Sequence, residues 1–182
     1  WDQVLDDTNQ PFFKWFVGAK TNITHNAIDR HLKTYRKNKL ALIWESEDGK
    51  INRTFSYYSL NREVSRMANI LKAMGIGKGD RVTIYMGRVP EIVFAMLACA
   101  RIGAIHSVVF GGFASHSLAS RIDDAKPKMV ISAEAGARGG KAVPYKPLLD
   151  EAINLSEHKP SKVLIINRKL VEYTQVAGRD LD

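Results

Sequence analysis

A short glycine-rich stretch at residues 136–141 carries the residue types that could bind a phosphate. Its sequence is Gly-Ala-Arg-Gly-Gly-Lys, so the cations Arg138 and Lys141 stand three residues apart. Gly139 and Gly140 separate them and leave the backbone N–H groups accessible to a ligand. Positive side chains and free N–H donors favour a phosphate, whereas a mobile, solvated loop would have the same composition. From the residues alone, the two interpretations are equally good.

The common catalytic and metal-binding motifs are absent from the sequence. The stretch at 136–141 is not a Walker A loop, because Ala135 and Ala142 stand where that motif needs Gly and Ser or Thr. The sequence also has no Gly-x-Ser-x-Gly, His-Glu-x-x-His or Cys-x-x-Cys pattern. We therefore predict no catalytic residue and no metal site in these 182 residues.

A second pair of glycines, Gly111 and Gly112, follows an apolar run at residues 105–110 that indicates a strand. Residues 82–86 indicate another strand, and residues 91–102 between the two are apolar nearly all round, as in a buried helix. Strand, helix and strand over about 30 residues predict a βαβ unit with parallel strands and a right-handed connection. Ligands gather at the carboxyl ends of such strands, so Gly111 and Gly112 are predicted to lie near a ligand.

The whole chain predicts an α/β fold whose mostly parallel sheet is built of βαβ units. Residues 1–40 form a helical and aromatic strip, which we expect to pack onto a larger body. An antiparallel β-hairpin at residues 40–57 should lead the sheet, with Asp48-Gly49 at its turn. Further along we expect helices at 58–74, 115–124 and 148–155, strands at 128–132 and 162–166, a loop at 134–147 and an irregular tail at 168–182.

The composition is that of a globular protein with a basic surface. The chain is 45% hydrophobic and 25% charged, and its net charge is +8. Because the cations are spread along the chain, they favour a phosphorylated small ligand over nucleic acid or an acidic membrane. One cysteine, Cys99, excludes an intrachain disulfide framework, and no apolar run reaches ~18 residues, so no membrane span is expected. We expect a cytoplasmic protein, or a mitochondrial matrix protein if a targeting segment precedes Trp1.

Four stretches together resemble a known family. They are WFVGAKTNITHNAIDRHL at 15–32, GDRVTIYM at 79–86, MLACARIGAIHSVVFGGF at 96–113 and SRIDDAKPK at 120–128. They look like the amino-terminal part of the AMP-forming acetyl-CoA and propionyl-CoA synthetases of the adenylate-forming superfamily. The resemblance covers essentially all 182 residues.

The resemblance implies a two-step reaction with small-molecule substrates and no nucleic-acid or membrane partner. A short carboxylate attacks ATP with Mg²⁺ present, giving an acyl-adenylate and pyrophosphate, and the CoA thiol then displaces AMP. By similarity, Arg138, Gly139, Gly140 and Lys141 match the segment that binds the phosphorylated adenosine end of CoA, and the glycines at 111–112 lie toward the pantetheine channel. The family's ATP, Mg²⁺ and acyl sites match nothing here. We therefore expect a fragment of the large amino-terminal domain that has little activity without the missing carboxyl-terminal remainder.

Two details resemble the propionyl-CoA branch of the family. They are Phe-Ala-Ser-His at 113–116 and the lysine that closes 138–141, whereas Gly87-Arg88 departs from the Met-Pro usual after the strand. By the same resemblance, residues 1–55 are an acetyl-CoA synthetase-type amino-terminal segment, and residues 56–182 are the first part of an AMP-binding domain. A stand-alone basic module that binds nucleotides or nucleic acid without catalysis remains the alternative, motivated by the net charge of +8.

Overall fold

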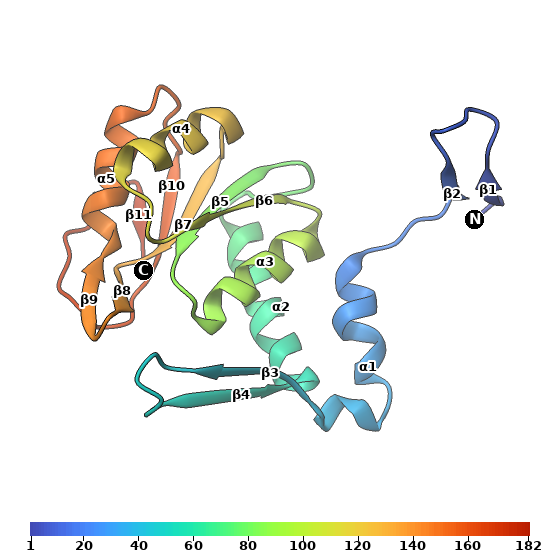
Figure 1. Cartoon of the computed structure of the whole chain (residues 1–182), viewed down its shortest axis with the longest axis horizontal. Coiled ribbons are helices and arrows are strands. Elements are labelled where there is room, and N and C mark those ends of the chain that lie inside the picture. Colours follow the sequence, from blue (N-terminus) through green and yellow to red (C-terminus); the bar gives the residue numbers. More distant parts are fainter.

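The computed structural model describes all 182 residues and has three layers around a parallel sheet. The sheet has five strands in the order β11-β10-β7-β5-β6, and every pairing in it is parallel. Helices α2 and α3 cover one face, and α4 and α5 cover the other (Figure 1). The bounds are β5 Arg81–Met86, β6 Ile105–Phe110, β7 Met129–Ala133, β10 Lys162–Ile166 and β11 Asp180–Leu181 for the strands, and α2 Tyr57–Ala73, α3 Pro90–Ile102, α4 Ser115–Ala125 and α5 Tyr145–Leu155 for the helices. The predicted α/β fold with its βαβ units is confirmed.

Helix α3 shows why the central βαβ unit folds as its sequence predicts. Pro90 occupies the first turn, where its missing N–H costs no hydrogen bond, and Gly103 ends the helix in the left-handed conformation with φ of 76°. The helix buries Phe94 and Cys99 against its surroundings, and burial raises the pKa of the Cys99 thiol to about 11. Cys99 is therefore a core residue, and an unreactive one at neutral pH.

The β-hairpin after residue 40 does not lead the parallel sheet, contrary to the sequence prediction. Strands β3 (Leu40–Glu45) and β4 (Asn52–Ser56) pair only with each other and form a sheet of their own. Side chains attach this hairpin to the body: the Trp44 indole N–H donates to the Arg88 carbonyl at 2.8 Å, and Arg53 pairs with Glu91 at 2.7 Å. The predicted strands are thus correct, but their place in the fold depends on long-range contacts.

Residues 134–147 are not the loop that their glycines indicated. They contain a second small hairpin, with β8 at Ala135–Arg138 and β9 at Lys141–Pro144. Its two-residue turn is Gly139-Gly140, with φ of 59° and 71°. Positive φ at both central positions is what a tight hairpin turn of the I′ type requires, and glycine adopts it without strain.

The carboxyl-terminal tail is also more ordered than expected, because β11 at Asp180–Leu181 adds a parallel strand to the edge of the sheet. Asp180 is buried and pairs with Lys146 at 3.0 Å and with Arg179 at 2.6 Å. Buried charges need such partners. The pattern of apolar residues could not show this strand, because a polar ion-pair network fixes it in place.

The first 40 residues form a hairpin, which does not pack on the body, and short helical turns, which do so through the buried Ile28. Strands β1 (Gln3–Asp6) and β2 (Lys14–Val17) pair antiparallel, and the hairpin stands apart from the sheet domain (Figure 1). Its aromatic side chains are exposed, for example Phe12 at 73% and Trp15 at 63%. The helical part of the predicted strip is irregular and is divided into η1 (His25–Asp29), α1 (Arg30–Leu32) and η2 (Tyr35–Asn38).

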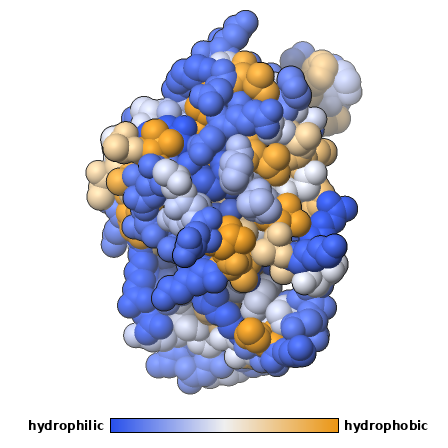
Figure 2. Space-filling model, turned by 90° about the vertical axis from the view of Figure 1, so that its left-hand side faces the viewer, coloured by the Kyte–Doolittle hydropathy of each residue, from blue (hydrophilic) through white to orange (hydrophobic).

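Hydrophilic and apolar side chains are unevenly distributed over the surface of the protein. The side that carries α5 and the β8–β9 hairpin is mostly hydrophilic, with small separate apolar patches (Figure 2). None of the helices combines the length and the hydropathy that a membrane crossing needs. The larger apolar surfaces lie on the amino-terminal hairpin and along β6, where Ile105 and Phe110 are exposed.

Residues 1–182 produced on their own are expected to self-associate. The aromatic hairpin is exposed, and β6 is an edge strand with one unpaired side, so both can pair with other copies. Sedimentation velocity and binding of a hydrophobic dye measure this directly. A monomer that melts cooperatively and binds no dye would contradict the expectation.

Candidate functional site

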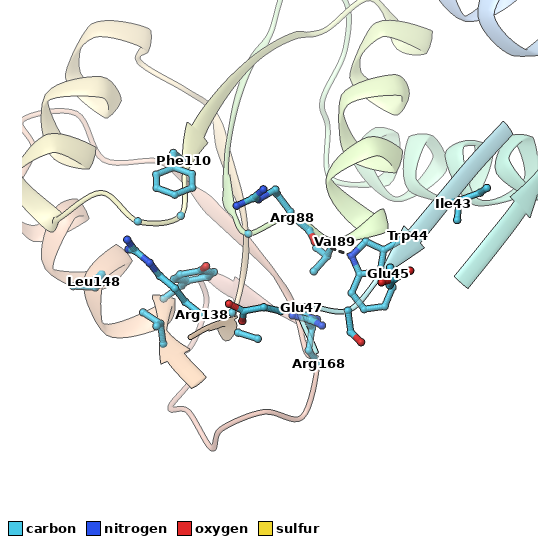
Figure 3. Close-up of a pocket in the computed structure, with 18 residues that line it drawn as sticks. Ile43, Trp44, Glu45, Glu47, Arg88, Val89, Phe110, Arg138, Leu148 and Arg168 are labelled. Carbon is cyan, nitrogen blue, oxygen red and sulfur yellow. Dashed lines mark hydrogen bonds between the residues drawn. The ribbon is translucent and has the colours of Figure 1, made fainter. Parts of the chain in front are cut away.

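A cavity of about 530 Å³ lies at the carboxyl ends of the central strands. It opens between the β3–β4 and β8–β9 hairpins, and its walls include the ends of β5 and β6 (Figure 3). Both predicted stretches contribute to it, through Gly111 and Gly112 on one side and Arg138 on the other. Parallel sheets bind ligands at this edge.

Gly136 and Ala137 also line the cavity, whereas the last three residues of the predicted phosphate stretch lie at the tip of the β8–β9 hairpin, outside the cavity lining. Gly139, Gly140 and Lys141 are all exposed there. Arg138 and Lys141 are direct partners in the β8–β9 ladder. Like charges that face each other across two strands repel, and an anion bound between them would remove that cost. The hairpin therefore gives the two cations a fixed spacing suited to an anionic group.

One hydrogen-bond donor of the hairpin turn is already occupied by an acidic side chain. The backbone N–H of Gly139 donates to a carboxylate oxygen of Glu47 at 2.7 Å. Glu47 extends from the turn of the β3–β4 hairpin toward the hairpin that carries Arg138 (Figure 3). A phosphate bound at the turn would compete with this carboxylate, so the turn already holds an anion of the chain itself.

Two further arginines line the cavity, and sequence reasoning did not assign them to it. Arg88 follows β5, and its carbonyl accepts the indole N–H of Trp44 at 2.8 Å. Arg168 follows β10, and its backbone N–H donates to the buried carboxylate of Glu134 at 2.8 Å. The departure from the family pattern at Gly87-Arg88 was the only sequence feature that drew attention to Arg88. No sequence feature indicated that Arg168 would line the cavity.

The glycines at the strand ends have a packing role that the sequence did not indicate. A Cβ atom on Gly136 would lie 2.2 Å from the Tyr145 hydroxyl oxygen, and one on Gly111 would lie 2.8 Å from Cζ of that ring. Gly87 is also close, with a Cβ distance of 3.0 Å to the same oxygen. At Gly112 a Cβ would collide with the ring of Phe110 at 2.4 Å. Gly87 after β5, Gly111 after β6 and Gly136 in β8 thus form a socket for the Tyr145 ring.

Tyr145 and Tyr85 pack against each other under the cavity, with ring centroids 5.5 Å apart. The Tyr85 hydroxyl donates to the carbonyl of Phe113 at 2.9 Å, and burial raises the pKa of Tyr85 to about 12. Burial also raises the pKa of Tyr145, although the positive charges of Arg168 and Arg138 act in the opposite direction. Both phenols therefore keep their protons at neutral pH.

The arrangement can bind an anion but holds no reactive group of its own. The cavity combines the guanidinium groups of Arg88, Arg138 and Arg168 with apolar walls such as Val89 and Val143. Across the described chain, no three His, Cys, Asp or Glu side chains gather as metal ligands would. This chemistry suits a ligand with phosphate groups and a less polar portion.

A three-layer α/β domain with a cationic cavity at its strand ends belongs to the ligand-binding proteins of the α/β class. The chain belongs to the family of AMP-binding enzymes, whose model matches residues 28–180. The model of the acetyl-coenzyme A synthetase N-terminus matches residues 1–27. The resemblance noted in the sequence is thereby confirmed.

Several curated proteins are similar over nearly the whole chain. A propionate–CoA ligase from Escherichia coli is 53% identical over 180 residues, which are 99% of this chain and 28% of the relative. The human mitochondrial acyl-CoA synthetase short-chain family member 3 is 46% identical over 183 residues, covering all of this chain and 27% of the relative. An acetyl-coenzyme A synthetase from Methanothrix thermoacetophila is 45% identical over 181 residues, 98% of this chain and 27% of the relative. The chain thus spans little more than a quarter of the length of these relatives.

Proposed function

We propose that the full-length protein is an AMP-forming ligase that joins a short-chain carboxylate, propionate or acetate, to CoA. The observation that carries the proposal is that two family models cover the chain in succession, at residues 1–27 and 28–180. The relatives named above are all named for short-chain acyl-CoA synthesis. The alternative of a stand-alone nucleotide- or nucleic-acid-binding module gains no support from any of these similarities.

The proposed reaction has two displacements. A carboxylate oxygen attacks the α-phosphorus of ATP and pyrophosphate leaves, after which the CoA sulfur attacks the acyl carbon and AMP leaves. ATP and Mg²⁺ would be bound by residues beyond this chain, because the family's ATP and Mg²⁺ motifs match nothing in these 182 residues. The contribution of this chain is on the CoA side of the reaction.

The proposed CoA-binding residues are Arg138, Gly139, Gly140 and Lys141, with Gly111 and Gly112. Their support is the facing pair of cations on the β8–β9 hairpin and the cavity that both glycine stretches border. The phosphorylated end of CoA would lie at the hairpin, and the pantetheine portion would run toward the ends of β5 and β6. Glu47 would have to release the Gly139 N–H if a phosphate took that donor.

Replacing Arg138 with alanine in the full-length protein is expected to raise the KM for CoA about tenfold. A hydrogen bond to a charged group is worth roughly 1.5–3 kcal/mol, and the exposed position of Arg138 places the effect at the lower end. Because ~1.4 kcal/mol is a factor of ten, steady-state thioester formation at varied CoA concentration resolves the change. Lys141→Ala should act in the same direction but more weakly, because an ammonium lacks the planar fork of a guanidinium.

Two controls separate a binding role of Arg138 from a structural one. Carboxylate-dependent exchange of pyrophosphate with ATP precedes CoA binding, so its rate should not change in the variant. With dephospho-CoA, the difference in KM between the variant and the wild type should largely disappear if the 3′-phosphate is the partner of Arg138. Equal damage to pyrophosphate exchange and thioester formation would show that the hairpin has a structural role only.

We further propose the division into an amino-terminal segment at 1–55 and the first part of the AMP-binding domain at 56–182. In its support, only Thr24, Ile28 and Phe55 are buried before residue 56. The two family models meet inside the first part, at residues 27 and 28. For the compartment we propose the cytoplasm or the mitochondrial matrix, since the human relative is named as mitochondrial.

A further inference from the structure

The hydroxyl of Tyr145 lies at the wall of the cavity and has no hydrogen-bond partner inside the protein. The residue is 6% exposed, and its side chain forms part of the cavity wall. The other buried tyrosine, Tyr85, donates its hydroxyl hydrogen to a carbonyl at 2.9 Å, but the Tyr145 oxygen makes no hydrogen bond with any residue of the chain. The one fully buried side-chain oxygen without a partner is Thr83 Oγ1, so the Tyr145 oxygen stays accessible from the cavity, where it can bond an entering molecule.

The position of this hydroxyl is fixed from all sides. The Tyr145 backbone N–H donates to the carbonyl of Glu134 at 2.9 Å and anchors the start of α5. The ring lies in the socket of Gly87, Gly111 and Gly136, where a Cβ on any of them would come within 3.0 Å of the phenol. A ring held this closely cannot turn its hydroxyl toward another partner, so the oxygen stays directed at the cavity.

Packing does not explain why this position carries an oxygen. Phenylalanine would fill the same socket with the same ring and would present no hydrogen-bond donor to the cavity. The hydroxyl is uncompensated within the chain, and this points to a group that enters the cavity from outside.

The surroundings define the chemistry of that group. Three arginines, Arg88, Arg138 and Arg168, line the same cavity with two glutamates at 45 and 47, so the cations are in excess and favour a ligand that carries negative charge. The phenol keeps its proton at neutral pH, because burial raises the pKa of Tyr145. A protonated hydroxyl among arginines donates to an oxygen acceptor, and Tyr145 adds a short, fixed donor to the long and mobile cations.

We propose that the Tyr145 hydroxyl donates a hydrogen bond to an oxygen of the CoA molecule bound in this cavity. This inference rests on the proposed function and deepens it, because it adds a binding residue that lies at the floor of the site and belongs to neither glycine stretch. This hydrogen bond would also explain the socket glycines, because their lack of a Cβ atom allows the phenol to reach the ends of β5 and β6, where the ligand would lie.

The test compares Tyr145→Phe with the wild type in the full-length protein. The KM for CoA in thioester formation is expected to rise about fivefold, as for the loss of one hydrogen bond of ~1 kcal/mol. The rate of pyrophosphate exchange should stay the same, because adenylation does not need CoA. The melting temperature without ligand should be unchanged or higher, since the variant loses a hydroxyl that has no hydrogen-bond partner inside the protein.

Tyr85→Phe is the matched control, because it removes a hydroxyl from the neighbouring ring that is bonded to the Phe113 carbonyl. This variant should melt at a lower temperature and keep the wild-type KM for CoA. If Tyr145→Phe has the wild-type KM for CoA, or lowers the melting temperature as Tyr85→Phe does, the inference is overturned and the proposed function stands. If the wild type forms no thioester from CoA, both are overturned.

Discussion

The full-length protein is expected to use propionate with a kcat/KM about 10–200-fold higher than acetate. One methylene group in an apolar acyl pocket is worth roughly 1–3 kcal/mol, which corresponds to that range. The expectation rests on the propionyl-type sequences at 113–116 and 138–141, and on 53% identity to a propionate–CoA ligase against 45% to an acetyl-coenzyme A synthetase. Pyrophosphate exchange with each carboxylate in turn measures the preference at the adenylation step.

Butyrate serves as the control for this preference. If the pocket is fitted to three carbons, the fourth carbon must be forced into filled space, and overpacking offsets the gain from another methylene. Propionate should therefore exceed both of its neighbours. A tenfold preference for acetate would show that the two sequence features do not report on the acyl pocket. An absence of exchange with all three acids would remove the proposed function itself.

The central fold could be predicted well from the sequence, because strands that are buried on both faces have continuous apolar runs. Strands β5 and β7 are almost wholly buried, and their continuous apolar runs indicated parallel strands covered by helices. Pro90 and Gly103 marked the ends of α3 through the special backbone of proline and glycine. Each of these signals is local, and the features they determine are local as well.

The predictions failed where long-range contacts determine the structure. The β8–β9 hairpin has Ala, Gly and Lys at most positions where β-branched residues would have indicated strands, and its glycines indicated a loop. The tail was predicted to be irregular because it is polar and has no apolar pattern. In the structure, ion pairs hold β11 in place. The separate position of the β3–β4 hairpin likewise depends on contacts of Trp44 and Arg53 with distant residues.

The sequence indicated some residues of the candidate site but not others. Arg138 and the glycines stood out because cations between glycines are an unusual local pattern. Glu47 did not, since it meets the Gly139 N–H across a separation of 92 residues. Tyr145 was read only as part of a loop, and its role depends on three glycines in or after three different strands. The folding topology brings these residues together, and no local sequence pattern indicates which distant residues will meet.

Replacing Asp180 with alanine is expected to destabilise the β10–β11 edge by about 3 kcal/mol, the lower end of the cost of breaking a buried ion pair, because Lys146 keeps its second partner, Asp150. The side chains of Asp180 and Lys146 are 0% and 2% exposed, and their charged atoms lie 3.0 Å apart. The backbone N–H of Val163 on β10 donates to the Arg179 carbonyl at 2.9 Å, so its hydrogen exchange reports opening of this edge. In the full-length variant this amide should exchange 100-fold faster or more, since each ~1.4 kcal/mol is a factor of ten.

The same network predicts a pH dependence with a definite sign. Burial opposes ionisation of Asp180, but hydrogen bonds from Arg179, the Val176 N–H and Lys146 outweigh it and hold the pKa of this carboxyl below its usual value of 3.8. A pKa lowered by folding contributes stability above the unfolded value, and this contribution is lost as the pH falls through the folded one. Protection of the Val163 amide should therefore decline below about pH 4 in the wild type. Asp180→Asn should begin less protected and show a smaller decline.

An exposed ion pair supplies the contrast for this network. Arg66 pairs with Glu63 on the surface of α2 at 3.2 Å, with 64% of the arginine side chain exposed. Arg66→Ala should change stability by no more than about 0.5 kcal/mol, because solvent screens the pair and its loss buries no charge. If Asp180→Ala were as mild as Arg66→Ala, the ion pairs around Lys146 would not hold β11 against the sheet. Apolar packing of Leu181, which lies partly buried against the core, would then have to account for the strand.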